Sequence, residues 1–267
     1  MKKEKIIFFG NGPLAEAALE VLEKHFEVVF RARDKVDLET VKKLKSSHPE
    51  IHGVLASFGV MIKSDILEIF EPEGILNIHP SLLPLYRGAS PIETAILNGD
   101  TEFSVSIMKL VKGMDAGPIY YQKTFNDLPL VKSEIYRELA EAGAKWIAKN
   151  LANLPEPTLQ DDKKASFTQK IDKEMAVINP ATETAEEILR KIIAFQGFPK
   201  VRFTFYGQKC IILEAHIAKV GEIALLPIKC KDGGVINVDR LQPESKKTMD
   251  AKSFINGYAK PQQAWRG

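Results

Sequence analysis

Three polar residues in the middle of the chain have side chains that could together carry out acyl transfer. Asn77 and His79 lie two positions apart in residues 75–89, so on an extended strand both side chains project from the same face. Asp115 follows in a loop between two glycines, at residues 113–117. An imidazole titrates near neutrality, an amide can donate an N–H to a developing oxyanion, and a carboxylate can orient the ring or accept a proton. This combination suits transfer of an acyl group to an amine.

The surroundings of His79 favour a ligand site, although spacing alone leaves a structural role for this histidine open. Pro80 removes a ladder donor and ends the strand, which places His79 at the carboxyl end of the sheet, where open parallel sheets bind ligands. Ser81 is close by, but the G-x-S-x-G pattern of a serine nucleophile is absent. We therefore favour direct attack by an incoming amine over a covalent intermediate.

The order of the predicted elements indicates an α/β fold with a doubly wound, mostly parallel sheet. Buried-strand runs alternate with segments that have a helical apolar stripe. The predicted strands are residues 5–9, 27–31, 51–58, 75–79, 103–108 and 120–125, and the predicted helices are residues 14–24, 38–47, 64–70, 89–98 and 133–151.

The carboxyl-terminal third has a different order of predicted elements, which indicates a second domain. Residues 153–170 are polar, contain Pro155 and Pro157, and are typical of a linker. Beyond them we expect a helix and several short strands, at residues 184–195, 201–206, 209–218, 224–228 and 235–241. This pattern favours a small β-barrel or sandwich. We assign a catalytic domain to residues 1–152, a linker to residues 153–175 and a smaller barrel domain to residues 176–267.

Composition is ordinary for a globular protein of 267 residues, with 45% hydrophobic and 27% charged residues. The amino-terminal apolar run at residues 6–9 is shorter than the core of a signal peptide and far shorter than a membrane span. Cys210 and Cys230 have no cysteine or histidine neighbours at metal-ligand spacing, so we expect free thiols and no metal site. We expect a cytoplasmic, monomeric protein without membrane partners.

Charge is distributed unevenly along the chain. Residues 1–170 carry 22 Lys and Arg against 24 Asp and Glu, whereas residues 171–267 carry 15 against 11. A basic carboxyl-terminal domain is compatible with a polyanionic partner such as RNA, and also with an ordinary solvated surface.

Two loops near the predicted strand ends could bind small groups. Gly10, Asn11 and Gly12 precede the first helix and leave backbone N–H groups near its amino terminus, but Ala15 stands where a dinucleotide fingerprint has its third glycine, which argues against NAD or FAD. The second loop is apolar and fits either a binding loop or plain core; it consists of Phe58, Gly59, Val60, Met61 and Ile62.

Residues 77–88, N-I-H-P-S-L-L-P-L-Y-R-G, followed by residues 115–119, D-A-G-P-I, resemble the signature of the folate-dependent formyltransferases. The resemblance implies transfer of a formyl group from 10-formyltetrahydrofolate to an amine. It further implies that Asn77 and a protonated His79 stabilise the oxyanion of a tetrahedral intermediate, while Asp115 keeps the ring charged and assists proton removal. In this family the backbone of two loops holds the pterin. These loops match Phe58 to Ile62 and Val111 to Asp115, the second of which contains Met114.

The carboxyl-terminal half resembles the barrel domain of the methionyl-tRNA formyltransferases, through residues 192–195, 241–249 and 254–257. That domain is similar to an OB-fold and contacts tRNA with basic residues. The resemblance implies initiator methionyl-tRNA and folate as partners. It makes the following residues candidates for substrate contacts: Gly10, Asn11, Gly12, Arg31, Arg33, Arg87, Lys246 and Lys247. Lys246 and Lys247 also fit plain solvated lysines.

One departure from the tRNA-directed pattern keeps other acceptors open. Those enzymes have a long basic insertion between the second strand and its helix, whereas here residues 30–36 lead almost directly into the helix that starts at Leu38. Arg31, Arg33 and Lys35 could do part of the work of that loop. The alternatives are the amino group of a nucleotide-linked sugar and an RNA-binding module on an inactive enzyme body.

Overall fold

The computed structural model describes residues 3–259, which form two compact units. The first unit contains the described residues up to Ala95 together with Asp100–Lys170, and the second contains Ile96–Gly99 and the described residues from Ile171 onward. Residues 260–267, which we assigned to the carboxyl-terminal domain, lie outside the described residues.

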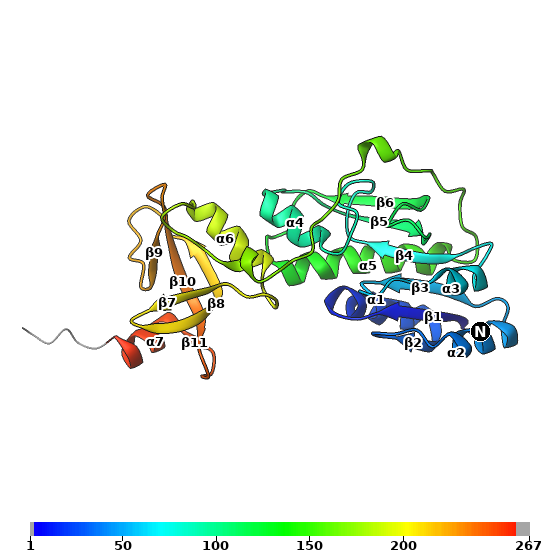
Figure 1. The fold of residues 1–267 in the computed structure, drawn as a ribbon, viewed down its shortest axis with the longest axis horizontal. Coiled ribbons are helices and arrows are strands. Elements are labelled where there is room, and N and C mark those ends of the chain that lie inside the picture. The colour runs from blue at the N-terminus through cyan, green and yellow to red at the C-terminus, as the bar shows by residue number, and fades with distance from the viewer. Residues whose placement is uncertain (1–2, 260–267) are drawn as a thin grey trace, which may run out of the picture. The chain divides into compact units, whose positions relative to one another are not determined.

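The first unit is built on a six-stranded sheet with the order β2-β1-β3-β4-β5-β6 (Figure 1). The pairs β1–β2, β1–β3 and β3–β4 are parallel, whereas β4–β5 and β5–β6 are antiparallel. The strands are β1 (Glu4–Gly10), β2 (Phe26–Ala32), β3 (His52–Ala56), β4 (Ile75–His79), β5 (Phe103–Lys109) and β6 (Ile119–Phe125). The predicted α/β class and mostly parallel sheet are confirmed.

Helices connect these strands at positions close to those predicted. They are α1 (Pro13–His25), α2 (Leu38–Ser47), α3 (Ser64–Ile69), α4 (Pro91–Asn98) and α5 (Lys132–Asn150). The expected helix at residues 89–98 begins two residues later, because Ser90 supplies the first carbonyl, which accepts from the Thr94 N–H at 3.0 Å. Only five residues separate β2 from α2, and the Asp37 side chain caps α2 by accepting from the Thr40 N–H.

The two faces of the sheet pack against different helices, and this decides where the polar residues of β4 lie. One face packs against α2 and α3 in a core cluster that includes Ile7, Phe9, Val41, Ile66 and Ile75. Ile78 lies on the other face, so close to α5 that a Cβ added at Gly143 would be 2.7 Å from its Cγ2. Because side chains alternate along a strand, Asn77 and His79 share the face of Ile75.

The second unit is a curled antiparallel half-barrel whose main path has the order β11-β10-β8-β7, with β9 paired to β10. Its strands are β7 (Arg202–Phe205), β8 (Gln208–Ile217), β9 (Pro227–Lys229), β10 (Val235–Pro243) and β11 (Met249–Asp250), and its α-helices are α6 (Ala185–Ala194) and α7 (Ala251–Tyr258). The main path lacks the closure of a complete barrel.

Two parts of the second unit differ from the sequence-based expectation. The strand expected at residues 224–228 forms only at Pro227–Lys229, because Leu226 is buried and its N–H donates to the Asn237 side chain at 3.2 Å instead of entering a ladder. The short strand β11 and the helix α7 were not predicted; the Asp250 side chain caps α7 by accepting from the Ser253 N–H at 2.7 Å.

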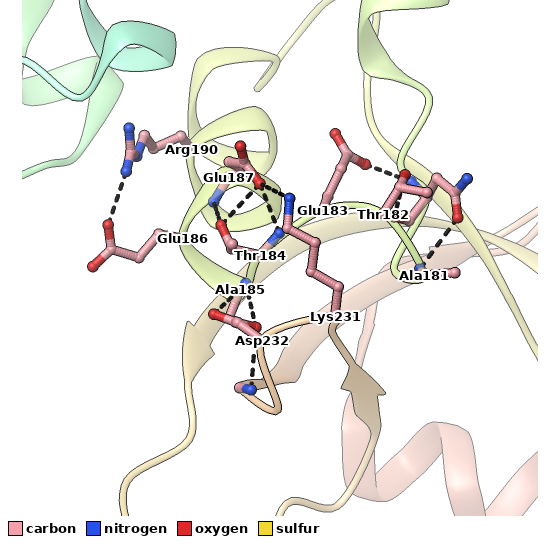
Figure 2. A network of polar contacts seen from close by, with 12 residues as sticks. Ala181, Thr182, Glu183, Thr184, Ala185, Glu186, Glu187, Arg190, Lys231 and Asp232 are labelled. Atoms are coloured by element: carbon pink, nitrogen blue, oxygen red, sulfur yellow. Dashed lines mark hydrogen bonds and ion pairs between the residues drawn. The ribbon is translucent and has the colours of Figure 1, made fainter.

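A capping box fixes the amino terminus of α6 (Figure 2). The Glu187 side chain accepts from the Thr184 backbone N–H, and the Thr184 hydroxyl accepts from the Glu187 N–H. These contacts lower the pKa of Glu187, chiefly through the Thr184 backbone N–H. Asp232 accepts from the Ala185 N–H at 3.3 Å, which ties the start of α6 to the turn between β9 and β10.

Residues 153–170, which we expected to be a linker, are not a free tether. Thr158 exchanges two backbone hydrogen bonds with Ile119, each 2.8 Å long. Further along, the Ser166 N–H donates to Pro84 O at 3.2 Å and Ser166 O accepts from the Arg87 N–H at 2.8 Å. Residues 153–170, which we call the strap, are therefore bound to the first unit by backbone hydrogen bonds.

The described residues include no helix long and apolar enough to span a membrane. Within residues 3–259, no group of three His, Cys, Asp or Glu side chains could hold a metal ion. Cys210 and Cys230 are buried free thiols, and burial raises the pKa of both.

Candidate active site

Strand β4 carries two of the three predicted catalytic residues to the edge of a cavity. Asn77 and His79 are 5% and 4% exposed, and both line the cavity. Their strand lies between β3 and β5, with His79 opposite Ser106. The strand ends at Pro80, as expected, so the imidazole lies where the sheet opens rather than inside it.

The imidazole of His79 contacts an acceptor at each ring nitrogen. Nε2 lies 3.1 Å from Tyr86 O. Because a carbonyl only accepts, Nε2 must carry a hydrogen in this contact. Nδ1 lies 3.7 Å from Asp115 Oδ1, and the Asp115 side chain is 15% exposed. The structure thus brings Asp115 beside His79 from a segment 36 positions further along the sequence.

Unusual backbone conformations place the groups that surround His79. Asp115 has φ 46° and Tyr86 has φ 57°, both in the left-handed region that residues with a Cβ rarely adopt. Asp115 Oδ2 accepts from the Gly88 N–H at 2.7 Å, so its carboxylate is held by one loop and points Oδ1 toward the ring. Such strain persists only where the surroundings over-determine it, and it is often found at functional sites.

The cavity beside these residues has a volume of about 350 Å³. This lies within the usual range for small-molecule sites. Asn77, His79 and Asp115 form part of its wall. The remaining wall includes every residue that we expected around a pterin, namely Phe58, Gly59, Val60, Met61, Ile62, Val111 and Met114.

The side chains of these two loops differ in their exposure to solvent. Phe58 and Ile62 are 5% and 8% exposed and pack into the core cluster, which is the alternative that the sequence left open for them. Met61 and Met114 are 81% and 59% exposed. The loops therefore present flexible thioether side chains, while Phe58 and Ile62 anchor the first loop to the core.

Arg31 and Arg33, expected to contact substrate, form a charged cluster with Glu16 at the carboxyl end of β2. Arg31 donates from two nitrogens to Glu16, at 3.0 and 2.5 Å, and Arg33 donates to the same carboxylate at 3.2 Å. The hydrogen bond from Arg31 is the main reason that the pKa of Glu16 is lowered. Neither arginine is among the residues that line the 350 Å³ cavity.

The loop of Gly10, Asn11 and Gly12 lies beside this cluster, and Arg31 also donates to Gly10 O at 3.3 Å. The glycine at position 10 has a packing reason, because an added Cβ would lie 2.4 Å from Ala56 O. These three residues do not line the cavity, whereas Leu14 in the following helix does.

The other expected substrate contacts have different surroundings. Lys246 and Lys247 are exposed in the turn after β10 of the second unit. Arg87, by contrast, is 4% exposed and has protein partners: its guanidinium donates to Gln160 at 3.1 and 2.8 Å and to Asp162 at 2.7 Å. We therefore revise the expectation for Arg87, because the side chain holds the loop in place instead of facing substrate.

Two family models together match most of the chain. A model described as formyl transferase matches residues 6–151, and a model described as formyl transferase, C-terminal domain matches residues 170–259. This chain belongs to the formyl transferase family.

The formyltransferase is also similar to individual proteins. It is 35% identical over 261 residues to "Methionyl-tRNA formyltransferase" of Dehalococcoides mccartyi (strain CBDB1), a match that covers 92% of this chain and 81% of the relative.

Among solved structures, HypX from Aquifex aeolicus in complex with tetrahydrofolic acid has a TM-score of 0.72 at 18% identity, covering 97% of this chain and 48% of that one. Methionyl-tRNA formyltransferase from Clostridium thermocellum has a TM-score of 0.68 at 20% identity, covering 90% and 98%. An N-formyltransferase from Helicobacter canadensis in complex with folinic acid and dTDP-3-aminofucose has a TM-score of 0.65 at 22% identity, covering 91% and 100%. These likenesses show the fold.

Three residues of the formyltransferase that hold the catalytic loops were not predicted. Ser106 is fully buried; its hydroxyl donates to Ser81 O at 2.6 Å and accepts from the Leu83 N–H at 3.1 Å. Gln122 donates to the Ser106 hydroxyl at 2.9 Å. Gln160 donates to the Asp115 carbonyl at 2.7 Å. The available signal for Ser106 was a serine in a largely apolar strand, since buried hydroxyls require partners, but Ser104 in the same strand gave the same signal.

Proposed function

We propose that this enzyme transfers the formyl group of 10-formyltetrahydrofolate to the amino group of initiator methionyl-tRNA. The observation that carries the proposal is the meeting of Asn77, His79 and Asp115 at one cavity whose other walls include the two expected pterin loops. Family membership supports the formyl transfer itself. The name of the Dehalococcoides relative supports methionyl-tRNA as the acceptor.

The proposed reaction needs no protein nucleophile. The acceptor amine attacks the formyl carbon and a new C–N bond forms. The bond from that carbon to N10 of the folate breaks as N10 takes up the proton that the amine has released, passed on through Asp115 or water. The Asn77 amide and the Nδ1–H of a protonated His79, whose Nε2–H donates to Tyr86 O, stabilise the oxyanion of the tetrahedral intermediate. Asp115, beside Nδ1, holds the ring in orientation and takes the proton that leaves the attacking amine, directly or through water.

Charge supports a nucleic-acid acceptor independently of the relatives. Residues 171–267 carry an excess of basic over acidic residues, 15 against 11. Lys246 and Lys247 are exposed in this half and can contact phosphates. Phosphate contacts make affinity depend strongly on salt.

A nucleotide-linked amino sugar is the second candidate acceptor. The connection between β2 and α2 is only five residues long, so it lacks the basic insertion of the tRNA-directed pattern. The solved Helicobacter canadensis enzyme, which is bound to dTDP-3-aminofucose, matches 91% of this chain in fold. The short connection favours an acceptor smaller than tRNA.

A formylation assay with both acceptors separates these proposals. Purified enzyme and 10-formyltetrahydrofolate are offered charged initiator tRNA and dTDP-3-aminofucose side by side, and formylated product is measured for each. We expect turnover of the tRNA, weakening steeply as salt rises, and little turnover of the sugar nucleotide. Rapid, salt-insensitive turnover of the sugar would reverse the assignment. Binding of tRNA with no formyl transfer to either acceptor would identify an RNA-binding protein without this activity.

The proposed attack also predicts a pH dependence. The acceptor amine attacks only in its neutral form, so kcat/KM should fall as the pH is lowered below the pKa of that amine. Initial rates from pH 5.5 to 9.5 at constant ionic strength test this. A rate that does not fall toward acid would contradict direct attack by the amine.

A further inference from the structure

Gln160 lies in the strap, outside the strands and helices that carry the catalytic residues. It follows Thr158, which pairs with Ile119, and it precedes a short 3-10 helix at Asp162–Lys164. Its side chain is half-buried and is not among those lining the cavity. Gln160 therefore cannot act on the reacting atoms directly.

The side-chain amide of Gln160 uses its full hydrogen-bonding capacity. Nε2 donates to the backbone carbonyls of Asp115 and Gly117, both at 2.7 Å. Oε1 accepts from Nε and Nη2 of Arg87, at 3.1 and 2.8 Å. Because carbonyls only accept and a guanidinium only donates, these partners leave a single orientation for the amide.

The partners of Gln160 belong to the two loops that hold His79. Tyr86 O contacts His79 Nε2, and the Gly88 N–H donates to Asp115 Oδ2. Arg87 is the residue between these two contacts. The two bonds from Gln160 Nε2 hold the backbone carbonyls of Asp115 and of Gly117 in the same loop. One amide thus joins the loop that bears the carboxylate to the loop that orients both the carboxylate and the imidazole.

The Asp115 loop has little freedom to adjust if this connection is lost. A Cβ at Gly117 would lie 1.8 Å from Lys109 O, so the backbone passes very close to β5 at this point. Asp115 has a left-handed backbone, at φ 46°. A change at the Asp115 carbonyl would therefore rotate the residue and alter the 3.7 Å separation between Oδ1 and His79 Nδ1.

We propose that Gln160 is a positioning residue that sets the geometry of the His79–Asp115 pair. The proposal deepens the proposed function, on which its kinetic test rests. It gives residues 153–170, which their composition predicts to be a linker, a part in positioning the catalytic residues. It also explains the burial of Arg87, whose guanidinium is the counterpart that orients the Gln160 amide.

The test compares Gln160→Glu with Asp162→Asn in the full chain. Gln160→Glu keeps the shape and an acceptor for Arg87 but replaces Nε2, the donor to both carbonyls, with an oxygen. Asp162→Asn changes the other hydrogen-bond partner of Arg87. The Asp162 side chain is 79% exposed, and this substitution leaves the bond from Gln160 to the Asp115 carbonyl intact. We expect kcat to fall about 10- to 100-fold in Gln160→Glu, with KM for the folate nearly unchanged, because small misplacements of reacting groups cost this much. Asp162→Asn should behave like the wild type.

Two further measurements separate positioning from a merely structural role. In Gln160→Glu the pH profile of kcat should change shape, because His79 has moved relative to Asp115, and the melting temperature should stay close to that of the wild type. Gln160→Met repeats the test without an added charge and covers the case in which Gln160→Glu does not fold. A loss of rate that follows the folded fraction, with KM and the pH profile unchanged, would overturn the proposal, as would wild-type kcat in Gln160→Glu.

A readout that needs no acceptor keeps this test apart from that of the proposed function. The ring 15N signals of His79, assigned by their disappearance in His79→Ala among five histidines, report the surroundings of both ring nitrogens. We expect these signals to shift in both Gln160 variants and to stay in place in Asp162→Asn. Unshifted signals would reject the positioning role. If the wild type formylates neither acceptor while the signals shift, the proposed function fails and the positioning role stands.

Discussion

Replacing His79 with alanine is expected to lower kcat for formyl transfer by about 1,000-fold, since the change removes an oxyanion donor and the group paired with Asp115. His79 is 4% exposed, and its ring contacts Tyr86 O at 3.1 Å, so alanine leaves a small cavity and an unsatisfied carbonyl. His79→Gln retains a donor of similar reach and should lose less. Single-turnover rates with saturating folate measure the effect on the chemical step.

The control for this variant is His25→Ala, because His25 is an exposed histidine at the end of α1. It should have wild-type rates. Circular dichroism and thermal unfolding establish that the His79 variants are folded. Wild-type turnover in folded His79→Ala would reject the whole assignment of the site.

Replacing Asp115 with asparagine is expected to lower kcat by about 100- to 1,000-fold, through loss of the charge beside the imidazole. The substitution keeps the size of the side chain, and its amide oxygen can still accept the Gly88 N–H that now binds Oδ2 at 2.7 Å. Position is therefore largely retained while charge is removed. Little change in KM should accompany the fall in kcat, because Asp115 acts on the proton and on the ring rather than on binding.

A second charge-removing substitution tests whether the loss of kcat in Asp115→Asn comes from its position beside His79 or only from the change in net charge. Asp127→Asn removes an exposed carboxylate from the loop after β6 and should leave kcat unchanged. Equal losses in Asp115→Asn and Asp127→Asn would attribute the effect to net charge. A loss in Asp115→Asn that appears only in KM would reject its role in proton transfer.

The core of the site could be predicted because its information is local. Alternation places Asn77 and His79 on one face of a strand, and Pro80 ends that strand at the sheet edge where ligands bind. The doubly wound fold follows from apolar runs that alternate with helical stripes. The flanking glycines marked Asp115 as a candidate, and the resemblance paired it with His79 and gave the two loops their expected role around a pterin. The structure places all of these residues around one cavity.

Other features could not be predicted because they depend on partners distant in sequence. Arg87 was expected to meet substrate, yet it is buried against Gln160 and Asp162, more than seventy positions away. The shifted strand β9 likewise depends on a side chain from β10, Asn237, which takes the Leu226 N–H. Composition gives no sign of such contacts.

Sequence by itself determined the class of fold, the family and the chemical types at the reaction centre, because periodicity, proline and glycine positions and a long motif are readable along one chain. Tertiary structure decided how that centre is held. The 3.7 Å approach of Asp115 to His79 requires two loops with left-handed residues, and Gln160 connects those loops from a stretch that looks like a tether. The physical reason is that a buried guanidinium and strained loop carbonyls must find hydrogen-bond partners, and only folding decides which residues supply them.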